Sequence, residues 1–501
     1  MQYSAEQRIA FHKYNEGKNV FLTGPGGTGK TALIKYLRAH AMSHGIDLQV
    51  CAMTGCAAVL LQCKAKTVHS WAKIGIANGS IEKNVRKVTG NFYARAEWKK
   101  VNVLVIDEVS MMSRKMFEML DAIAKACRRN SRPFGGIQMV LSGDFYQLPP
   151  VGTKDEPETL EFCFQSPLWG ETFKPENHVQ LTKIFRQTDE TYQNILNQIR
   201  VGRVKRSSNE RLLKNVGRVA GDDVVICPTK LFPTRNKVES LNATKLCEID
   251  EEEFVFNLKV RNDLEMTEKD RVQRTKYTSE QINLEIAYLK SNLRCDPTVI
   301  LKRGAQVMCI VNMELSNGTS LCNGSQGVVV EFNKDKNPII EYSDGQRVTM
   351  TPHVWPSENI PGIGISQVPL ILAWALTIHK SQGATLECAE VDVGSGIFEC
   401  GQTYVALSRV KSLDGLYLTS FDVSRININK HVQDFYNSLP RVLETPERLV
   451  NMPDILFPQP QPLPPVALAN PPPIAIATPA PIVSEKEGAI AVAVAVAVPI
   501  R

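Results

Sequence analysis

The sequence has no closely spaced cysteine pairs. Its twelve cysteines are dispersed singly, and none forms a C-x-x-C motif or has a histidine partner at metal-ligand spacing. Structural zinc and iron–sulfur sites depend on such spacing, so neither centre is expected. Scattered cysteines are typical of reduced thiols, and they indicate the cytosol, the nucleus or a similar reducing compartment.

Long apolar stretches are also missing. No run of about 18 apolar residues occurs, and the opening MQYSAEQRIAFHKYNEG has neither an apolar signal core nor an arginine-rich, acid-free presequence. The sequence therefore predicts no membrane segment, no secretion and no mitochondrial presequence. We expect an intracellular protein of the nucleus or cytoplasm, and this expectation is compatible with a viral origin.

The chain carries little excess charge, with a formal net charge of +6. Lysine and arginine form only small clusters, such as Lys99-Lys100 and Arg128-Arg129, whereas basic arms that coat nucleic acid need long Lys/Arg blocks. A polyanionic partner would therefore meet a local groove. The hydrophobic share of 43% and the length of 501 residues are typical of a soluble globular protein with two or three domains.

Short apolar runs alternate with helical stretches from Asn19 onward. This alternation predicts parallel strands in doubly wound α/β sheets. The first α/β domain is expected at residues 1–180. A second lobe is expected at residues 181–300 and 366–440, with strand-like segments at 223–229 and 368–380.

Residues 301–365 contain short alternating segments broken by the turn signals SNGTS, CNGSQG, NKDKNP and SDGQ. This pattern predicts a small β-barrel inserted into the second lobe. The charged segment 248–295 is interpreted as a helical or loop connector. Twelve of the 29 prolines lie beyond Asn451, so we expect an extended, disordered tail at 441–501. The tail is either a docking segment for a protein partner or featureless.

The strongest chemical signal is an eight-residue loop that follows the apolar strand NVFL and precedes a helix. Its residues are Gly24, Pro25, Gly26, Gly27, Thr28, Gly29, Lys30 and Thr31, which fit G-x-x-x-x-G-K-[ST]. In such a loop backbone N–H groups wrap phosphates, Lys30 reaches the β- and γ-phosphates, and Thr31 ligates Mg²⁺. An ordinary Gly-rich turn would leave Lys30 unexplained, so the loop predicts nucleotide binding.

Two further strand ends carry candidate catalytic groups. The strand VNVLVID ends in Asp107-Glu108, beside the expected phosphate loop. Asp107 is expected to hold Mg²⁺ through water and Glu108 to polarise the attacking water; the alternative is a surface acidic pair. After the strand IQMVLSGD, the uncharged amide of Gln147 is either a sensor of the γ-phosphate or part of a plain turn. Together these groups predict hydrolysis as well as binding.

With several other segments, these motifs resemble the Pif-type (petite integration frequency) DNA helicases. This family lies on the 5′-to-3′ branch of superfamily one, alongside the RecD and Dda helicases. The matching segments cover residues 1–435 in the family's order: GPGGTGKT, TGCAA, TVHSW, VLVIDEVSM, FGGIQMVLSGDFYQLPPV, LTKIFRQ, LAWALTIHKSQGATLE and GQTYVALSRVKSLDGLYL. The segment MFEMLDAIAKACRRNSRPFGGIQ resembles the family's signature insert, and the proline-rich tail lies outside the resemblance.

The resemblance implies two RecA-like P-loop NTPase domains with an inserted SH3-like barrel. It implies ATP as substrate, Mg²⁺ as cofactor, and single-stranded and forked duplex DNA as partners. Gln7 matches the glutamine that reads adenine, and Arg186 and Arg409 match second-lobe arginines that reach the γ-phosphate. A planar guanidinium supplied across a cleft would stabilise the transferring phosphoryl group, unless these residues are a surface ion pair and a helix-end charge.

The family's nucleic-acid-facing positions fall on loops away from the ATP cleft. Hydroxyl and imidazole groups there can bind phosphates without committing to sequence. Trp71 either stacks on a base or packs beneath its loop. Gln382 and Gly383 are candidates for a relay between the strand and the ATP cleft. The matched positions are Thr54, Gly55, Thr67, His69, Trp71, Thr377, His379, Lys380 and Ser381.

Family analogy also places a wedge that splits the duplex in a small insert at about residues 72–100. The aromatic candidates there are Phe92, Tyr93 and Trp98, and core packing is the alternative for each. The inserted barrel would roof the strand channel or simply stabilise the second lobe.

The sequence thus predicts an ATP-dependent 5′-to-3′ DNA helicase of replication, repair, recombination or telomere maintenance. ATP would draw the two lobes together, and hydrolysis would reopen them to give one step. The alternative from another class is a nucleic-acid-binding remodeller that translocates or grips without separating strands. An AAA-type or kinase-like P-loop protein is disfavoured, because those classes do not need the downstream segments TIHKSQG and VALSR.

Overall fold

The computed structural model describes residues 3–439, apart from 62, 76, 78, 220–226, 294, 312, 315–319, 322, 343–344, 358–359, 379–380, 382–383 and 395–396. These residues all belong to one unit, Met1–Leu443. The predicted tail at 441–501 lies outside the described residues.

The first lobe is built on a parallel sheet with the strand order β3-β2-β4-β5-β1-β6. Strands β1 and β4 are buried along their whole length, as expected for a sheet covered by helices on both faces. The strands are β1 (Val20–Thr23), β2 (Leu48–Ala52), β3 (Lys66–Thr67), β4 (Val103–Asp107), β5 (Gln138–Gly143) and β6 (His178–Gln180).

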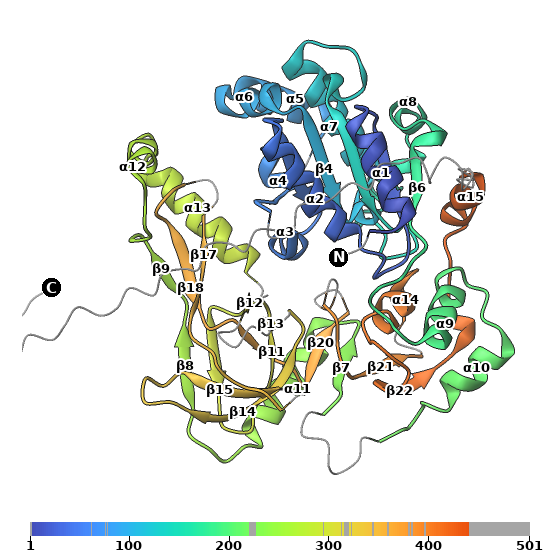
Figure 1. Ribbon diagram of the computed structural model, residues 1–501, viewed down its shortest axis with the longest axis vertical. Helices are drawn as coiled ribbons and strands as arrows, with labels where there is room; N and C mark the ends of the chain where they lie inside the picture. Colours follow the sequence, from blue (N-terminus) through green and yellow to red (C-terminus); the bar gives the residue numbers. More distant parts are fainter. Residues whose placement is uncertain are drawn as a thin grey trace, which may run out of the picture. The chain divides into compact units, whose positions relative to one another are not determined.

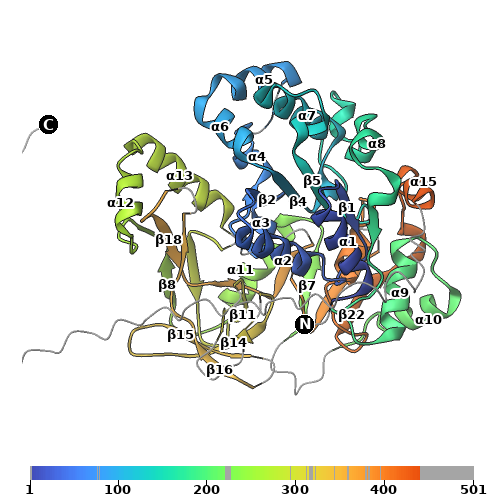
Figure 2. The same ribbon diagram turned by 45° about the horizontal axis from the view of Figure 1, so that its top comes forward.

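Helices surround this sheet in both views (Figures 1 and 2). They are α1 (Ala5–Asn15), α2 (Lys30–Ser43), α3 (Gly55–Leu61), α4 (Val68–Trp71), α5 (Ile81–Gly90), α6 (Phe92–Lys100), α7 (Arg114–Arg128) and α8 (Leu168–Thr172). Helix α7 is amphipathic: Met116, Phe117 and Leu120 on its inner side belong to the lobe's hydrophobic core. The α/β alternation of the sequence is confirmed here.

The second lobe has its own parallel sheet in the order β20-β7-β21-β22. Its strands are β7 (Thr229–Phe232), β20 (Ala375–Thr377), β21 (Ala389–Val393) and β22 (Leu416–Phe421). Its helices are α9 (Glu190–Arg200), α10 (Arg206–Leu213), α11 (Arg235–Cys247) and α14 (Gln402–Leu407). Two parallel α/β sheets confirm the expected pair of RecA-like lobes.

The two strand-like segments expected in this lobe behave differently. Of the segment 223–229, residues 223–226 lie outside the described residues, and β7 begins only at its last residue, Thr229. The apolar run 368–380 is divided between two sheets, since β19 (Leu370–Leu372) pairs with β11 (Gln306–Cys309) while β20 pairs with β7. An apolar run marks burial but does not show which sheet a strand joins.

The region between β7 and β20 is antiparallel, which confirms the predicted β-rich insert. Its main sheet has the order β16-β15-β14-β11-β19, and a smaller one the order β17-β18-β9. Their remaining strands are β9 (Lys259–Arg261), β14 (Gln326–Phe332), β15 (Pro338–Tyr342), β16 (Arg347–Thr349), β17 (His353–Pro356) and β18 (Gly364–Gln367). Two-stranded pairs are formed by β8 (Phe254–Asn257) with β10 (Thr298–Leu301) and β12 (Met313–Glu314) with β13 (Ser320–Leu321).

The interpretation of 248–295 as a helical or loop connector is wrong in part. The segment contains helices α12 (Glu268–Arg274) and α13 (Ser279–Asn292), but also β8 and β9, which pair with β10 and β18 of the insert. In β8 the side chains alternate between half-buried and exposed, and the acidic run Asp250 to Glu253 directly precedes the strand. The charge of the segment therefore hid two strands that pair with β10 and β18.

The last described helix, α15 (Lys430–Ser438), packs on the first lobe although it follows the second lobe in sequence. Val432 is buried in the first-lobe core, and Phe435 stacks on Phe164 with ring centres 4.4 Å apart. Figure 1 shows α15 beside β6 and α8. Helix α15 thus connects the end of the second lobe to the first lobe.

Two global properties bear on the expected cellular setting. Within the described part of the chain, helices fall short of the length and apolar character that crossing a membrane requires. The ten cysteines whose side chains are described form no disulfide with one another.

Candidate functional site

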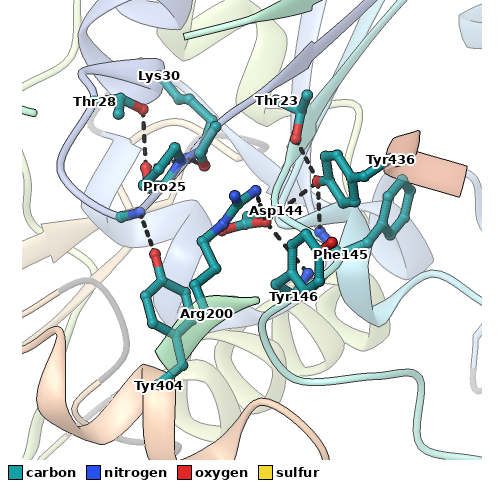
Figure 3. A network of polar contacts seen from close by, with 12 residues as sticks. Thr23, Pro25, Thr28, Lys30, Asp144, Phe145, Tyr146, Arg200, Tyr404 and Tyr436 are labelled. Atoms are coloured by element: carbon teal, nitrogen blue, oxygen red, sulfur yellow. Dashed lines mark hydrogen bonds and ion pairs between the residues drawn. The ribbon is translucent and has the colours of Figure 1, made fainter. Parts of the chain in front are cut away.

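The loop between β1 and α2 is closed by its own side chains. Lys30 donates from Nζ to the backbone oxygens of Gly24 at 2.7 Å and Pro25 at 3.0 Å. Thr28 donates from Oγ1 to the Pro25 oxygen at 2.9 Å (Figure 3). Gly27 has a φ of +85°, and a Cβ there would lie 2.6 Å from the Cβ of Arg186. Only glycine therefore fits where the second lobe approaches the loop.

Two carboxylates follow β4 near this loop. Asp107 is 6% exposed, and burial raises the pKa of its carboxyl while Lys30 opposes the change. Glu108 has left-handed backbone angles, φ 58° and ψ 41°, which are uncommon for a non-glycine residue. Burial lowers the pKa values of Lys30, Arg186 and Arg409, and the charge of Glu108 opposes this in all three.

Two arginines of the second lobe reach the phosphate loop. A Cβ on Gly26 would lie 3.5 Å from Nη1 of Arg186 and 3.6 Å from Nη2 of Arg409. Arg409 donates to Ser408 Oγ at 2.8 Å and to the Val405 oxygen at 2.9 Å. Burial, and after it the neighbouring Arg186, lowers the pKa of Arg409 to about 9. The buried guanidinium of Arg409 and the half-buried guanidinium of Arg186 beside the loop make a site that favours an anion.

Sequence reasoning missed Tyr404 on α14. Its hydroxyl accepts a hydrogen bond from the backbone N–H of Gly26 at 2.8 Å (Figure 3). Burial raises the pKa of Tyr404 to about 12, so the hydroxyl keeps its proton at neutral pH. The residue lies five positions before Arg409 in the segment TYVALSR. Its place in a helix beside the arginine is a signal that could have drawn attention to it.

Gln147 lies where the first lobe meets α14. Its side chain is 6% exposed, and its backbone N–H donates to the Asp144 oxygen at 2.9 Å. Gly401, the N-cap of α14, has a φ of +75°, and a Cβ there would lie 2.6 Å from the Gln147 oxygen. The segment after β5 therefore touches the helix that carries Tyr404. A movement of Gln147 would therefore be passed directly to α14, which carries Tyr404.

A buried polar network lies beneath the phosphate loop (Figure 3). Arg200, at the end of α9, donates from Nε and Nη2 to the two carboxylate oxygens of Asp144, each at 2.8 Å. Tyr436 of α15 donates to Asp144 Oδ1 at 3.2 Å, and its hydroxyl also lies 2.6 Å from Thr23 Oγ1. Its ring stacks on Tyr146 with centres 4.7 Å apart. Sequence reasoning did not find this network, because its members lie far apart in the chain.

Gln7 lies at the far end of the phosphate loop. Its side-chain Nε2 donates to the backbone oxygens of Thr28 at 3.4 Å and Gly29 at 3.2 Å. Its Oε1 accepts from the Ser4 N–H at 2.8 Å, which completes the capping box of α1. Gln7 thus braces the loop, and recognition of adenine remains a prediction. Thr31, the second residue of α2, is exposed.

The first-lobe residues that are expected to face single-stranded DNA cluster at the ends of β2 and β3. Thr54 accepts from the Ala57 N–H at 3.2 Å at the start of α3, where Gly55 is half-buried. Thr67 caps α4 by accepting from the Ser70 N–H at 3.2 Å. Helix starts present further backbone N–H groups, which suit phosphates.

His69 and Trp71, on α4, differ in exposure. His69 is half-buried, and burial lowers the pKa of its imidazole. Trp71 is 3% exposed, and its ring centre lies 4.4 Å from that of Trp98. The structure therefore supports packing beneath the loop for Trp71, and base stacking is not available to its buried ring.

The structure describes only some of the second-lobe residues that are expected to contact single-stranded DNA. Thr377 ends β20 and is 8% exposed. Ser381 is fully buried, and its hydroxyl donates to the Ile378 oxygen at 2.8 Å; its contact with single-stranded DNA remains a prediction. His379, Lys380, Gln382 and Gly383 lie outside the described residues.

The aromatic candidates for a wedge separate clearly by exposure. Trp98 is fully buried, and its indole N–H donates to the Ala72 oxygen at 3.4 Å, so it is a core residue. Phe92 is 68% exposed and Tyr93 is 74% exposed, both at the start of α6. Only these two can meet a partner.

The chain matches family models in two places, one covering the first lobe and the start of the second, the other within the β-rich insert. Residues 2–210 match the family described as PIF1-like helicase, and residues 291–332 match the description "DNA helicase Pif1, 2B domain". The chain is 34% identical to the ATP-dependent DNA helicase PIF1 of Xenopus laevis over 453 residues, which cover 88% of this chain and 65% of the relative. It is 33% identical to the ATP-dependent DNA helicase RRM3 of Saccharomyces cerevisiae, over 87% of this chain and 67% of that protein.

Solved structures show the same similarity in three dimensions. The crystal structure of Pif1 helicase from Candida albicans has 32% identity and a TM-score of 0.66, and the match covers 88% of this chain and all of that one, 100%. The Pif1 helicase from Bacteroides in complex with ADP-AlF3 and ssDNA has 27% identity and a TM-score of 0.56, over 87% of this chain and 97% of that one.

Proposed function

Because the chain belongs to the PIF1-like helicase family, we propose that it is an ATP-dependent DNA helicase. It would move 5′ to 3′ along single-stranded DNA and separate the duplex ahead. The chain spans 65% of the length of the Xenopus relative, so the proposal concerns the motor that the two lobes form. Replication, repair, recombination or telomere maintenance are the settings in which such a motor acts.

The approach of Arg186 and Arg409 to Gly26 carries this proposal. A Cβ on Gly26 would be within 3.6 Å of a nitrogen of each guanidinium, and the two arginines come from the other lobe. ATP bound by the phosphate loop would place its terminal phosphate near these cations. Hydrolysis would then remove the anion that holds the lobes together, which couples the chemistry to lobe movement.

The position of each site residue supports its proposed role in ATP binding or hydrolysis. Lys30 would bind the β- and γ-phosphates after leaving the carbonyl oxygens of Gly24 and Pro25, which it contacts at 2.7 and 3.0 Å. Glu108 would orient the attacking water, and Gln147 would register the γ-phosphate. Gln7, beside the end of the loop, would read the adenine edge.

The oxygen ligands beside the phosphate loop fit Mg²⁺. Thr31 offers a hydroxyl and Asp107 a carboxylate, and Mg²⁺ prefers hard oxygen donors, keeps several waters and binds substrate phosphates. Among the described residues there is no group of three or more His, Cys, Asp or Glu side chains suited to a metal ion. The donor set therefore suits an ion that arrives with ATP, whose charge Mg²⁺ would offset during hydrolysis.

Single-stranded DNA would bind on the loops that carry Thr54, Gly55, Thr67 and His69 in the first lobe and Thr377 in the second. These loops follow strand ends, and two of them open helices α3 and α4. The complex of Bacteroides Pif1 with ADP-AlF3 and ssDNA supports simultaneous binding of nucleotide and strand in a similar fold. The backbone N–H groups and hydroxyls would contact phosphates without reading sequence.

ATP hydrolysis measured with and without single-stranded DNA tests the proposal. Forked duplexes with a 5′ or a 3′ single-stranded tail then test polarity, with Lys30→Ala as the inactive control. We expect strong stimulation by DNA and unwinding only from the 5′ tail. Stimulation without unwinding would favour a remodeller that grips DNA, whereas ATP turnover indifferent to any nucleic acid would overturn the motor.

A role in DNA maintenance also accords with an intracellular location, in the nucleus or cytoplasm. We propose that the tail at 441–501 docks a protein partner. Pull-down with the full chain and with the tail deleted tests this, and equal capture by both would leave the tail featureless.

A further inference from the structure

A cationic cavity lies outside the ATP site, among α5, α6 and α7. It has a volume of about 600 Å³, and its lining includes Arg86 of α5, Arg95 and Lys99 of α6, and Arg129 at the end of α7. The other lining residues are Thr89 and small or uncharged groups, and none carries a carboxylate. Figure 1 shows α5 and α6 close to α7 in the first lobe. Four cations therefore share one cavity whose lining supplies no counter-charge.

Two basic pairs of the sequence, Lys99-Lys100 and Arg128-Arg129, each place one member at this cavity and the other elsewhere. Lys100 forms an ion pair with Asp47 at 3.2 Å, while its neighbour Lys99 lines the cavity. Arg128 donates to the backbone oxygens of Trp98, Lys99 and Val101 at 2.9 to 3.0 Å, while its neighbour Arg129 lines the cavity. One member of each pair is bound to other groups of the lobe, and the other lines the cavity.

Exposed aromatic rings adjoin the same cations. Phe92 is 68% exposed and lies three and seven residues before Arg95 and Lys99, so the three share one side of α6. Tyr93, which is 74% exposed, meets Phe92 edge to face with ring centres 5.8 Å apart. Cations beside exposed aromatic rings are the composition of a nucleic-acid surface.

We propose that this cavity binds backbone phosphates of the DNA duplex at the fork, as a second DNA site separate from the tracked single strand. The proposal rests on the proposed helicase function and adds to it a place that holds the duplex for splitting. Arginine and lysine bind phosphate oxygens whatever the base sequence. Such binding suits a helicase, which must accept any base sequence at every step.

The duplex fits this cavity better than the tracked strand does. The tracked strand is proposed to bind at the starts of α3 and α4, whereas the cavity is formed by α5, α6 and α7. Helices α4 and α6 meet through the buried pair Trp71 and Trp98, with ring centres 4.4 Å apart. Phosphates in the cavity would therefore belong to DNA that lies beside the tracked strand, next to the exposed rings of Phe92 and Tyr93.

The test removes two of the four charges without touching the ATP site. The double variant Arg86→Gln, Lys99→Gln changes two exposed helical side chains to a residue that favours helices equally. The matched control is Arg211→Gln, Lys214→Gln, which removes the same charge from exposed positions at the second-lobe helix α10. Affinity for a forked duplex and for a single strand is measured between about 0.05 and 0.2 M salt, the range over which phosphate contacts weaken steeply.

We expect the cavity variant to bind the fork about tenfold more weakly near 0.1 M salt and to lose about one unit of salt slope per phosphate contact removed. Its affinity for the single strand and its strand-stimulated ATP hydrolysis should match those of the control. Equal losses for fork and single strand would overturn the assignment, because the cavity would then hold the tracked strand. Unchanged fork binding would also overturn it. Parent ATP hydrolysis without response to DNA would instead refute the helicase function itself.

Discussion

Arg200 binds both carboxylate oxygens of Asp144, at 2.8 Å each, in the core between the two lobes. Burial, which would lower the pKa of Arg200, is outweighed by the charge and hydrogen bonds of Asp144, which raise it. The Arg200 guanidinium also lies over the rings of Tyr146 and Tyr436, 4.5 and 5.2 Å from their centres. The first residue after β5 is thus tied to α9 and α15, directly beneath the ATP site.

Breaking this ion pair should destabilise the protein strongly. Arg200→Met is expected to cost about 3–5 kcal/mol, because it leaves the fully buried carboxylate of Asp144 without a counter-charge. The double variant Arg200→Met, Asp144→Asn should recover part of this loss. Urea-induced unfolding of the two variants measures the difference. Equal losses would show that the charge of Asp144 is not the source.

The Tyr436 hydroxyl should matter for stability and for ATP binding. Tyr436→Phe removes an oxygen that contacts Thr23 at 2.6 Å, the Phe145 N–H at 3.1 Å and Asp144 at 3.2 Å. We expect a loss of about 1–3 kcal/mol, since buried polar groups lose a partner, and a higher KM for ATP because Thr23 leads into the phosphate loop. Thermal unfolding and steady-state kinetics test this, with Tyr93→Phe at an exposed position as the unaffected control.

The second-lobe arginines should act on turnover more than on nucleotide binding. Arg186→Lys and Arg409→Lys keep a positive charge but lose the planar guanidinium, so kcat for ATP hydrolysis should fall about a thousandfold. Affinity for ADP should stay near the parent value, because these groups serve the γ-phosphate. Single-turnover hydrolysis and ADP titration separate the two effects, and a matching loss of ADP affinity would contradict the assignment.

Two neighbouring glycines should respond differently to alanine. Gly27→Ala forces a Cβ to within 2.6 Å of Arg186 at a φ of +85°, so it should prevent lobe approach and destabilise the chain. At Gly26 the nearest atom is 3.5 Å away, so Gly26→Ala should fold normally. Its methyl group would still stand between the loop and the arginines, and turnover should fall. Unfolding temperature and kcat, measured on both, test this contrast.

The exposed rings at the start of α6 should serve unwinding alone. Phe92→Ala, Tyr93→Ala is expected to lower the rate of fork unwinding while strand-stimulated ATP hydrolysis stays unchanged. Trp98→Ala should instead cost about 3–5 kcal/mol of stability, since its side chain is fully buried. Unwinding rates normalised to ATP turnover distinguish a wedge from a motor defect, and unaltered unwinding in the double variant would exclude both rings.

The phosphate loop and the carboxylates of β4 could be predicted from sequence because their chemistry is local. Gly24 to Thr31 form one continuous loop, and Asp107 follows directly from an apolar strand. Backbone geometry then places the groups with little help from the rest of the chain. Arg186 and Arg409 are different, since only a family resemblance marked them, and the fold brings them to Gly26.

Burial is where sequence reasoning did least well. Ser381 lies in a segment expected to face DNA, whereas for Trp71 and Trp98 core packing was one of two open alternatives; all three side chains are buried. A motif records residue types at a spacing, but whether a side chain points inward depends on what packs over it. Strands β8 and β9 were missed for another reason: they lie in a charged segment, and their partners β10 and β18 lie further along the chain.

The sequence by itself determined the two α/β lobes, the inserted β region and the nucleotide-binding loop, because periodic burial and local turns dictate these features. Only the tertiary structure decided that Tyr404 meets Gly26, that Asp144, Arg200 and Tyr436 form one network, and that four scattered cations share a cavity. These contacts join residues from separate parts of the chain. Their distances follow from the packing of whole helices, which no local pattern contains.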